Sequence, residues 1–230
     1  MVKKNQNKQD TIFVDCFSTI IFRKIKRKEV FKQWAKELST QFNIDWKTIY
    51  RLYMNTNFNL SFKKLFTTFT LQEEFGVVLK KVFSKLVKKY TWLSQKDFHD
   101  KAIDIYVEKE KACFSVNQEL IDFLLSEKQN GKKIYLVSDF YCKSDIFSKW
   151  FRHFKIEHVF DKIFSSCDFN KEKATTKLYK HLIKELQLDP KNVTMYGDNL
   201  WSDILMAKSC GLHAKRIKRK HKGENYAKSK

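Results

Sequence analysis

The first residue of this chain that could do chemistry is Asp15, which directly follows the apolar run from Thr11 to Val14. A run of β-branched and aromatic residues predicts a buried parallel strand, because both faces of such a strand are covered and alternation is lost. Open α/β sheets bind their ligands at the carboxyl ends of strands. A single Asp after a strand is also a common cap of the next turn or helix, so a functional role for Asp15 requires partners later in the chain.

Polar side chains follow the other predicted strands as well. In chain order they are Ser138 after 133–137, Lys173 in the loop after 160–166, and Asp198 and Asp203 after 193–196. In a parallel sheet these strand ends share one edge with Asp15. Phosphoryl transfer uses such a set: a nucleophile, hydroxyl and amine groups for the phosphoryl oxygens, and carboxylates for Mg²⁺. Magnesium takes oxygen ligands and keeps several waters, so one or two carboxylates and a backbone carbonyl suffice.

The elements that must position these groups form an α/β domain. Helices are predicted at 116–129, 146–154, 174–186 and 201–209, and they alternate with strands at 133–137, 160–166, 193–196 and 213–217. This alternation favours a parallel sheet. Gly131 ends the first of these helices, as glycine commonly does.

Between the first strand and residue 115 the sequence predicts only helices. Apolar side chains recur at helical spacing from Phe31 to Leu38, after Asp45 as an N-cap, over 71–90, and after Ser94 as a second N-cap. The α/β domain is therefore interrupted after its first strand. The predicted division is 1–21 with 115–217 for the α/β core, 22–114 for the helical insertion, and 218–230 for a basic tail expected to be disordered.

Composition restricts the classes of function. The 230 residues include 46 Lys and Arg against 26 Asp and Glu, a net charge of +20 with His neutral. This charge favours anionic partners, such as phosphorylated substrates, polyanions, nucleic acid or an acidic membrane surface, although solvated lysine faces would also produce it. Scattered cysteines indicate a reducing cytosol, and no apolar run reaches the ~18 residues that span a bilayer. Residues 1–10 read as a mobile leader without a signal peptide, so we expect a cytoplasmic protein.

In this order and on these elements, the motifs resemble those of the haloacid dehalogenase-like (HAD) hydrolases. The matching segments are Asp15-Cys16-Phe17-Ser18-Thr19, Ser138, Lys173, and Gly197-Asp198-Asn199-Leu200-Trp201-Ser202-Asp203. The resemblance implies a Rossmannoid core of about five parallel strands, with 22–114 in the place of a C1-type helical cap. The pattern is also similar to a bacterial subgroup that accompanies glycosyltransferases in surface-polysaccharide loci. That likeness suggests sugar phosphates or activated intermediates as substrates and polysaccharide-synthesis enzymes as partners.

The resemblance implies a phosphatase that works through an aspartyl-phosphate. Asp15 would be the nucleophile, and Ser138 and Lys173 would hold and neutralise the phosphoryl oxygens. Lys171 and Lys177 compete with Lys173 for this role, and the spacing of the motifs favours Lys173.

The resemblance also implies a Mg²⁺ site. Asp198 would bind the ion together with Asp15 and the Phe17 carbonyl, and Asp203 would complete or orient that set. Dehalogenating relatives lack the metal-binding Gly-Asp pair. The presence of Asp198 and Asp203 therefore argues for a metal and against dehalogenation.

One position departs from the family pattern. Family phosphatases usually carry an Asp two residues after the nucleophile as general acid and base, and here that residue is Phe17. A missing acid typically lowers the rate ~10²–10⁴-fold when the leaving group must be protonated. Three interpretations remain open: the leaving group departs unassisted; Asp139, Glu73 or Glu74 replaces the acid; or the domain is a scaffold that binds phosphorylated ligands without turnover.

Other candidate residues have weaker support. Arg23 could bind a carboxylate or second phosphate of the substrate, or could be a solvated side chain. Cys16 does not have the Cys-x5-Arg spacing of thiol phosphatases and reads as a small buried residue. The run 215–222 could bind nucleic acid or a membrane, but no nucleic-acid motif accompanies it, and we favour a solubilising or polyanion-tethering tail. The sequence does not indicate an oligomeric state.

Overall fold

The computed structural model describes residues 10–64, 72–140 and 142–218, and the side chains within these ranges except those at 57–64 and 72–77. The described residues form two compact units, one of 10–22 with 115–218 and one of 23–114. The predicted leader and basic tail lie outside the described residues, apart from Asp10 and Lys218.

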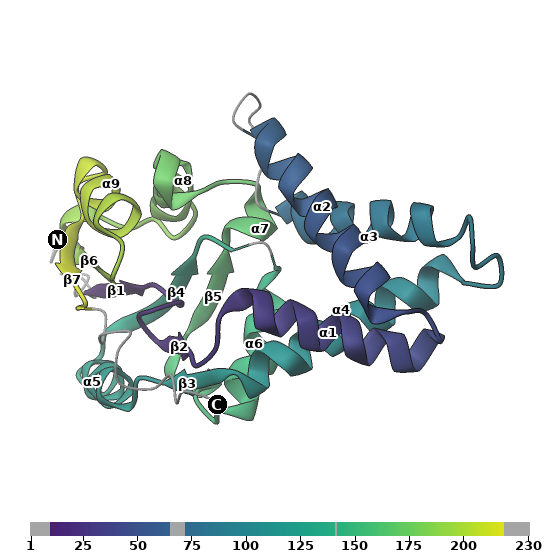
Figure 1. The fold of residues 1–230 in the computed structure, drawn as a ribbon. Helices are drawn as coiled ribbons and strands as arrows, with labels where there is room; N and C mark the ends of the chain where they lie inside the picture. Colours follow the sequence, from purple (N-terminus) through teal and green to yellow (C-terminus); the bar gives the residue numbers. More distant parts are fainter. Residues whose placement is uncertain (1–9, 65–71, 141, 219–230) are drawn as a thin grey trace, which may run out of the picture. The chain divides into compact units, whose positions relative to one another are not determined.

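The first unit is built on a five-stranded parallel sheet (Figure 1), so the predicted fold class is confirmed. The strands are, in spatial order, β5 (Lys162–Ser165), β4 (Lys133–Ser138), β1 (Thr11–Val14), β6 (Val193–Gly197) and β7 (His213–Arg216). Val14 lies opposite Leu136 of β4 and Tyr196 of β6, which places β1 in the middle. Because later strands add on both sides of β1, the end of β1 is the point where such sheets bind ligands.

Helices cover both faces of this sheet (Figure 1). One face carries α8 (Lys177–Glu185) and α9 (Met206–Ser209), and the other carries α5 (Gln118–Gln129). The remaining helical elements of this unit are α6 (Ser144–His153), α7 (Ser166–Phe169), η1 (Glu157–Val159), η2 (Lys173–Thr175), η3 (Pro190–Asn192) and the π-helix η4 (Leu200–Leu205). Sheet residues Phe13, Val137 and Met195 pack with Leu178 and Leu182 of α8 in a fully buried core. Each such side chain contributes about 1.5–3 kcal/mol through burial.

The second unit consists mainly of four helices. They are α1 (Arg27–Phe42), α2 (Trp46–Lys64), α3 (Gln72–Leu86) and α4 (Gln95–Ala112). Asp45 accepts a hydrogen bond from the Thr48 amide at 3.0 Å, and the Ser94 hydroxyl accepts one from the Asp97 amide at 3.3 Å, so both predicted N-caps are formed. Among the helices whose residues are described, none is long and apolar enough to cross a membrane.

The predicted aromatic stripe of this unit lies in its core. The Phe31 ring stacks on Tyr53 and Tyr106, with ring centroids 4.2 Å and 5.3 Å away. Trp34 is fully buried, and its indole N–H donates to the Ala102 carbonyl at 2.8 Å. These rings are used for packing, as their helical spacing indicates.

Two short strands are absent from the sequence prediction, which has only helices from 22 to 114. β2 (Ile21–Arg23) and β3 (Phe114–Val116) pair in a two-stranded sheet where the chain leaves the first unit and returns to it. Strands of three residues are too short to show a period of two. Helix boundaries also shift, because α5 begins two residues later than predicted and the predicted helix at 201–209 starts as a π-helix.

Candidate active site

Asp15 follows β1 directly and is held at the sheet edge by the backbone. Its amide donates to the Tyr196 carbonyl of β6 at 2.8 Å. A tight turn follows, in which the amides of Ile20 and Ile21 both donate to the Cys16 carbonyl and Ser18 adopts a φ of 61°. The turn leaves Asp15 at the end of the strand with 8% of its surface exposed.

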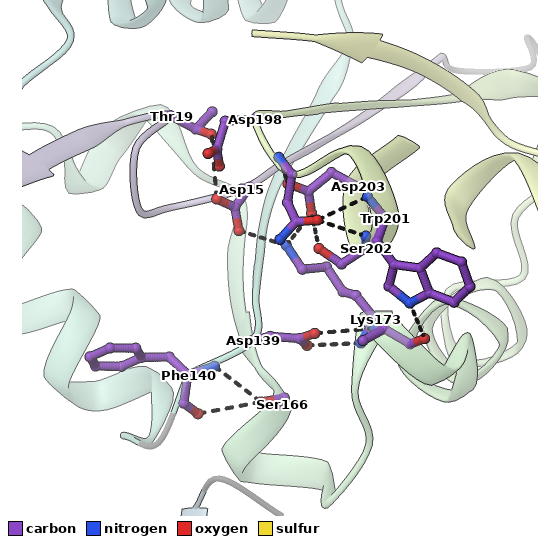
Figure 2. Close-up of polar contacts among 12 residues, drawn as sticks. Asp15, Thr19, Asp139, Phe140, Ser166, Lys173, Asp198, Trp201, Ser202 and Asp203 are labelled. Atoms are coloured by element: carbon purple, nitrogen blue, oxygen red, sulfur yellow. Dashed lines mark hydrogen bonds and ion pairs between the residues drawn. The ribbon is translucent and has the colours of Figure 1, made fainter. Parts of the chain in front are cut away.

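Lys173 joins two carboxylates of the site (Figure 2). Its ammonium lies 2.6 Å from Asp15 Oδ1 and 2.7 Å from Asp203 Oδ1. Burial lowers the pKa of Lys173, but the charges of Asp15 and Asp203 outweigh burial and hold that pKa well above its usual value. These charges favour the cationic form of Lys173, and it is the lysine, in preference to Lys171 or the exposed Lys177, that the fold brings to Asp15.

Three carboxylates form a group that could hold a metal ion. Asp15, Asp198 and Asp203 each place one oxygen within 4.8 Å of the others, and all three residues are buried. Burial, opposed by Lys173 and reinforced by the charges of Asp203 and Asp198, raises the pKa of Asp15 to about 7. These three carboxylates carry more negative charge than the single ammonium of Lys173 balances. A divalent cation with a preference for oxygen, such as Mg²⁺, fits this set of ligands.

Thr19 links two members of this group. Its hydroxyl lies 3.4 Å from Asp15 Oδ2 and 3.5 Å from Asp198 Oδ1 (Figure 2). A hydroxyl has one proton and donates to one of these oxygens at a time. Thr19 lies within the first motif, but its contact with Asp198 could not be predicted, because the two residues are far apart in the chain.

The segment after β6 is shaped to present Asp203. A Cβ on Gly197 would lie 2.3 Å from Asp203 Oδ2, so glycine is required by this close approach. The Asn199 amide donates to the same oxygen at 3.0 Å. The Asn199 side chain accepts bonds from the amides of Trp201 and Ser202 at 2.9 Å and 3.1 Å and thereby starts η4. The segment 197–203 thus combines the Asn199 cap, the close approach of Gly197 to Asp203, and the carboxylates of Asp198 and Asp203.

Asp139 positions the loop that carries Lys173. One carboxylate oxygen accepts from the Lys173 amide at 2.8 Å and the other from the Ala174 amide at 3.2 Å (Figure 2). Burial raises the pKa of Asp139, although these bonds and Lys173 oppose the shift. Because both oxygens are engaged, the geometry does not favour Asp139 as the replacement acid. The other two candidates, Glu73 and Glu74, have side chains outside the described set.

Ser138 ends β4, the strand that pairs with β1 ahead of Asp15. The residue is 1% exposed, and its Oγ has no hydrogen-bond partner among the described residues. A buried hydroxyl without a partner lowers stability by about 1–3 kcal/mol. This cost is offset if the hydroxyl meets an oxygen of a bound ligand, so Ser138 is suited to a phosphoryl group.

The ring of Phe17 belongs to an aromatic cluster. Its centroid lies 4.3 Å from that of Phe140, 6.1 Å from Phe147 and 6.2 Å from Trp150. Phe147 and Trp150 are fully buried residues of α6. The residue two positions after Asp15 is thus half-buried and packs against an aromatic cluster.

Arg23 is paired with a buried carboxylate. Its Nε and Nη2 lie 2.9 Å and 3.0 Å from the two carboxylate oxygens of Glu110, which is fully buried. The Tyr106 hydroxyl donates to the same carboxylate at 2.6 Å. The guanidinium charge is therefore balanced by Glu110 within the helical unit, and the role of Arg23 in substrate binding stays a prediction. Cys16 is fully buried, as its sequence context indicates.

Comparison with known proteins identifies a family. The sequence profile of the haloacid dehalogenase-like hydrolases matches residues 9–211. A search of curated proteins returned no significant match.

Several solved structures share the fold. A HAD phosphatase from Thermococcus onnurineus has a TM-score of 0.60 and 18% identity, over 95% of this chain and 90% of that one. YfnB of Bacillus subtilis, a HAD-type protein bound to magnesium, has a TM-score of 0.56 and 20% identity, over 92% and 87%. A dehalogenase with an intermediate complex has a TM-score of 0.55 and 14% identity, over 96% and 89%. At these identities the likeness shows the fold, which phosphatases and dehalogenases have in common.

Proposed function

The chain belongs to the haloacid dehalogenase-like hydrolases, and we propose that it is a Mg²⁺-dependent phosphatase that forms an aspartyl-phosphate on Asp15. One observation carries this proposal: Lys173 bridges Asp15 and Asp203 inside a buried cluster that also contains Asp198. A nucleophile, a fixed cation and a set of metal ligands thus meet at one sheet edge. Dehalogenation would use the nucleophile but not the carboxylates of Asp198 and Asp203.

The chain's own residues account for two chemical steps. A carboxylate oxygen of Asp15 attacks phosphorus, and the bond from phosphorus to the leaving oxygen breaks with its electron pair going to the leaving group. Lys173 and Ser138 hold the phosphoryl oxygens during this transfer. Water then attacks the same phosphorus, the bond to Asp15 breaks, and the carboxylate and inorganic phosphate are released.

The proposed metal ligands are the carboxylates of Asp15, Asp198 and Asp203 and the Phe17 carbonyl. When bound there, Mg²⁺ supplies positive charge that stabilises the negative phosphoryl oxygens and the nucleophile near one another.

The substrate is proposed to be a small phosphorylated metabolite. The net charge of +20 favours anions in general. Sugar phosphates and activated intermediates of surface-polysaccharide synthesis are the two classes suggested by the sequence. Enzymes of that synthesis are the proposed partners, and the cytoplasm is the proposed location.

The test is hydrolysis of 4-nitrophenyl phosphate by the purified full chain, with Mg²⁺ or with EDTA. We expect activity that needs Mg²⁺ and that falls by at least ~10³-fold in Asp15→Asn, which removes the nucleophile. Asp168→Asn is the matched control, because Asp168 accepts bonds from the Ser144 amide at the start of α6 and is not part of the cluster. Equal activity of Asp15→Asn and the wild type would overturn the proposal.

Phe17 favours one alternative, a module that binds phosphorylated ligands without turnover. It occupies the sequence position at which family phosphatases carry their general acid. This alternative predicts thermal stabilisation by phosphate with Mg²⁺ and no hydrolysis of any donor.

A further inference from the structure

The surroundings of Phe17 bear on the kind of phosphate that this site can cleave. The ring lies 4.3 Å from that of Phe140 and packs against Phe147 and Trp150 of α6, and none of these rings carries an acid that can protonate a leaving oxygen. Phe140 itself is 8% exposed, and its amide and carbonyl are both tied to the Ser166 hydroxyl (Figure 2). Phe17 is therefore held in an apolar cluster.

The titratable groups that influence Asp15 and Lys173 have other roles. Among the described residues they are Asp139, Tyr179, Asp198 and Asp203. Both oxygens of Asp139 accept backbone amides. Asp203 accepts from Lys173 and from the Asn199 amide, and it shares with Asp198 the proposed metal site.

Tyr179 does not supply the proton either. Its hydroxyl donates to the Ser202 carbonyl at 3.0 Å, and burial raises its pKa well above the usual value. Within the part of the α/β unit that the structure describes, the site thus has a nucleophile and a cation but offers no acid to the leaving group.

On the basis of the proposed function, we infer that the substrates are activated phosphates, meaning acyl phosphates and phosphoanhydrides, in preference to alkyl or sugar phosphate monoesters. The leaving group of an activated phosphate departs as a stable carboxylate or phosphate anion. The bond between phosphorus and that oxygen breaks while the bond from Asp15 forms, and no proton is transferred in the step. An alkoxide leaving group needs a proton, and a missing acid lowers its rate of departure by ~10²–10⁴-fold. Of the two substrate classes suggested by the sequence, the activated intermediates are favoured.

The experiment is a leaving-group series measured as kcat/KM with the wild-type chain and Mg²⁺. The donors are acetyl phosphate, 4-nitrophenyl phosphate, phenyl phosphate and glycerol 1-phosphate. We expect efficient cleavage of the first two and at least ~10²-fold less for the last two. Rates within about threefold across the series would overturn the inference and would point to a proton donor elsewhere, while the proposed function would stand. No turnover of any donor, together with no phosphorylation of Asp15, would overturn both.

Two variants at one position add an independent readout. Phe17→Asp should raise the phenyl to 4-nitrophenyl phosphate ratio of kcat/KM by at least ~10-fold, because it supplies the acid. Phe17→Leu removes the ring without adding an acid and should leave the ratio unchanged. A rise of the ratio in both variants would contradict the inference. Thermal melts show whether each variant is folded. If Phe17→Asp does not fold, the leaving-group series of the wild-type chain alone tests the inference.

Discussion

The Lys173 ammonium lies 2.6 Å from Asp15 Oδ1, and the Lys173 side chain is 1% exposed. A cation fixed in this way has two consequences. It holds the nucleophile in one orientation. It also balances part of the charge of three buried carboxylates, which stabilises this arrangement of side chains when no metal or phosphate is bound.

Lys173→Met is predicted to destabilise the metal-free protein by about 3–5 kcal/mol, because it leaves buried carboxylates without their cation. Denaturant unfolding in EDTA measures this loss, and hydrolysis of 4-nitrophenyl phosphate should fall with it. Lys177→Met is the control, since Lys177 is exposed and lies in the same segment. Equal stability of the two variants would show that Lys173 does not balance the cluster.

Gly197→Ala is predicted to weaken both stability and Mg²⁺ binding, because the new methyl group would overlap Asp203. The prediction is tested most sharply by a double-mutant cycle with Asp203→Gly, which removes the Cβ and carboxylate atoms that the new methyl group would overlap. The stability losses should then be less than additive by at least ~1 kcal/mol. Additive losses would mean that the approach of Asp203 is not the reason why position 197 requires glycine.

Asp139→Ala is predicted to lower kcat for 4-nitrophenyl phosphate by ~10-fold or more with little change in KM, because it frees the Lys173 loop without removing the ammonium. Asp139→Asn should recover part of the loss, since its single carbonyl oxygen can still accept one amide. Asp168→Ala is the matched control, because it also removes a carboxylate that accepts a bond from a backbone amide in the same unit. A loss in Asp168→Ala as large as that in Asp139→Ala would argue for a general effect on folding.

Mg²⁺ binding is predicted to depend on pH through Asp15. The pKa of this carboxyl is raised from 3.8 to about 7 in the folded, metal-free protein, so the folded state binds the proton more tightly than the unfolded state. The tighter binding of this proton stabilises the folded state. This stabilisation is fully present below about pH 4 and is lost as the pH rises to about 7. Because Mg²⁺ needs the ionised form, the rise in Tm on adding Mg²⁺ should be larger at about pH 8 than at about pH 6.

The control for this pH dependence is Asp15→Asn, in which the titrating group is gone. Its smaller response to Mg²⁺ should vary little over the same range. A wild-type response that is equal at both pH values would contradict the assignment of Asp15 as a metal ligand.

The sheet and the place of the site could be predicted from the sequence, because each relevant strand is a short apolar run that ends in a distinctive polar residue. Ser138 and Asp198 are found in this way at the ends of the two strands that flank β1. Lys173 required the spacing of the motifs, since a lysine in a polar loop looks like a surface residue until its partners are known.

Other features depend on contacts between residues far apart in the chain and could not be read from local pattern. The pairing of Arg23 with Glu110 is one, and the contact of Thr19 with Asp198 is another. Phe17 is a third case, because its sequence position suggests a missing acid but does not reveal that its ring is packed on Phe140. The short strands β2 and β3 could not be predicted, because three residues are too few to show the alternation of apolar and polar side chains in a strand.

The central claim is that Asp15 takes the phosphoryl group, and the most direct test is to locate that group. The wild-type chain is incubated with Mg²⁺ and acetyl phosphate labelled in the phosphoryl group, quenched in acid, digested and mapped by mass spectrometry. The account predicts label on Asp15 that hydroxylamine removes, as expected of an acyl phosphate, and no label on the equivalent peptide of Asp15→Asn. Label that persists in Asp15→Asn, or a wild-type Asp15 that stays unlabelled, would contradict it.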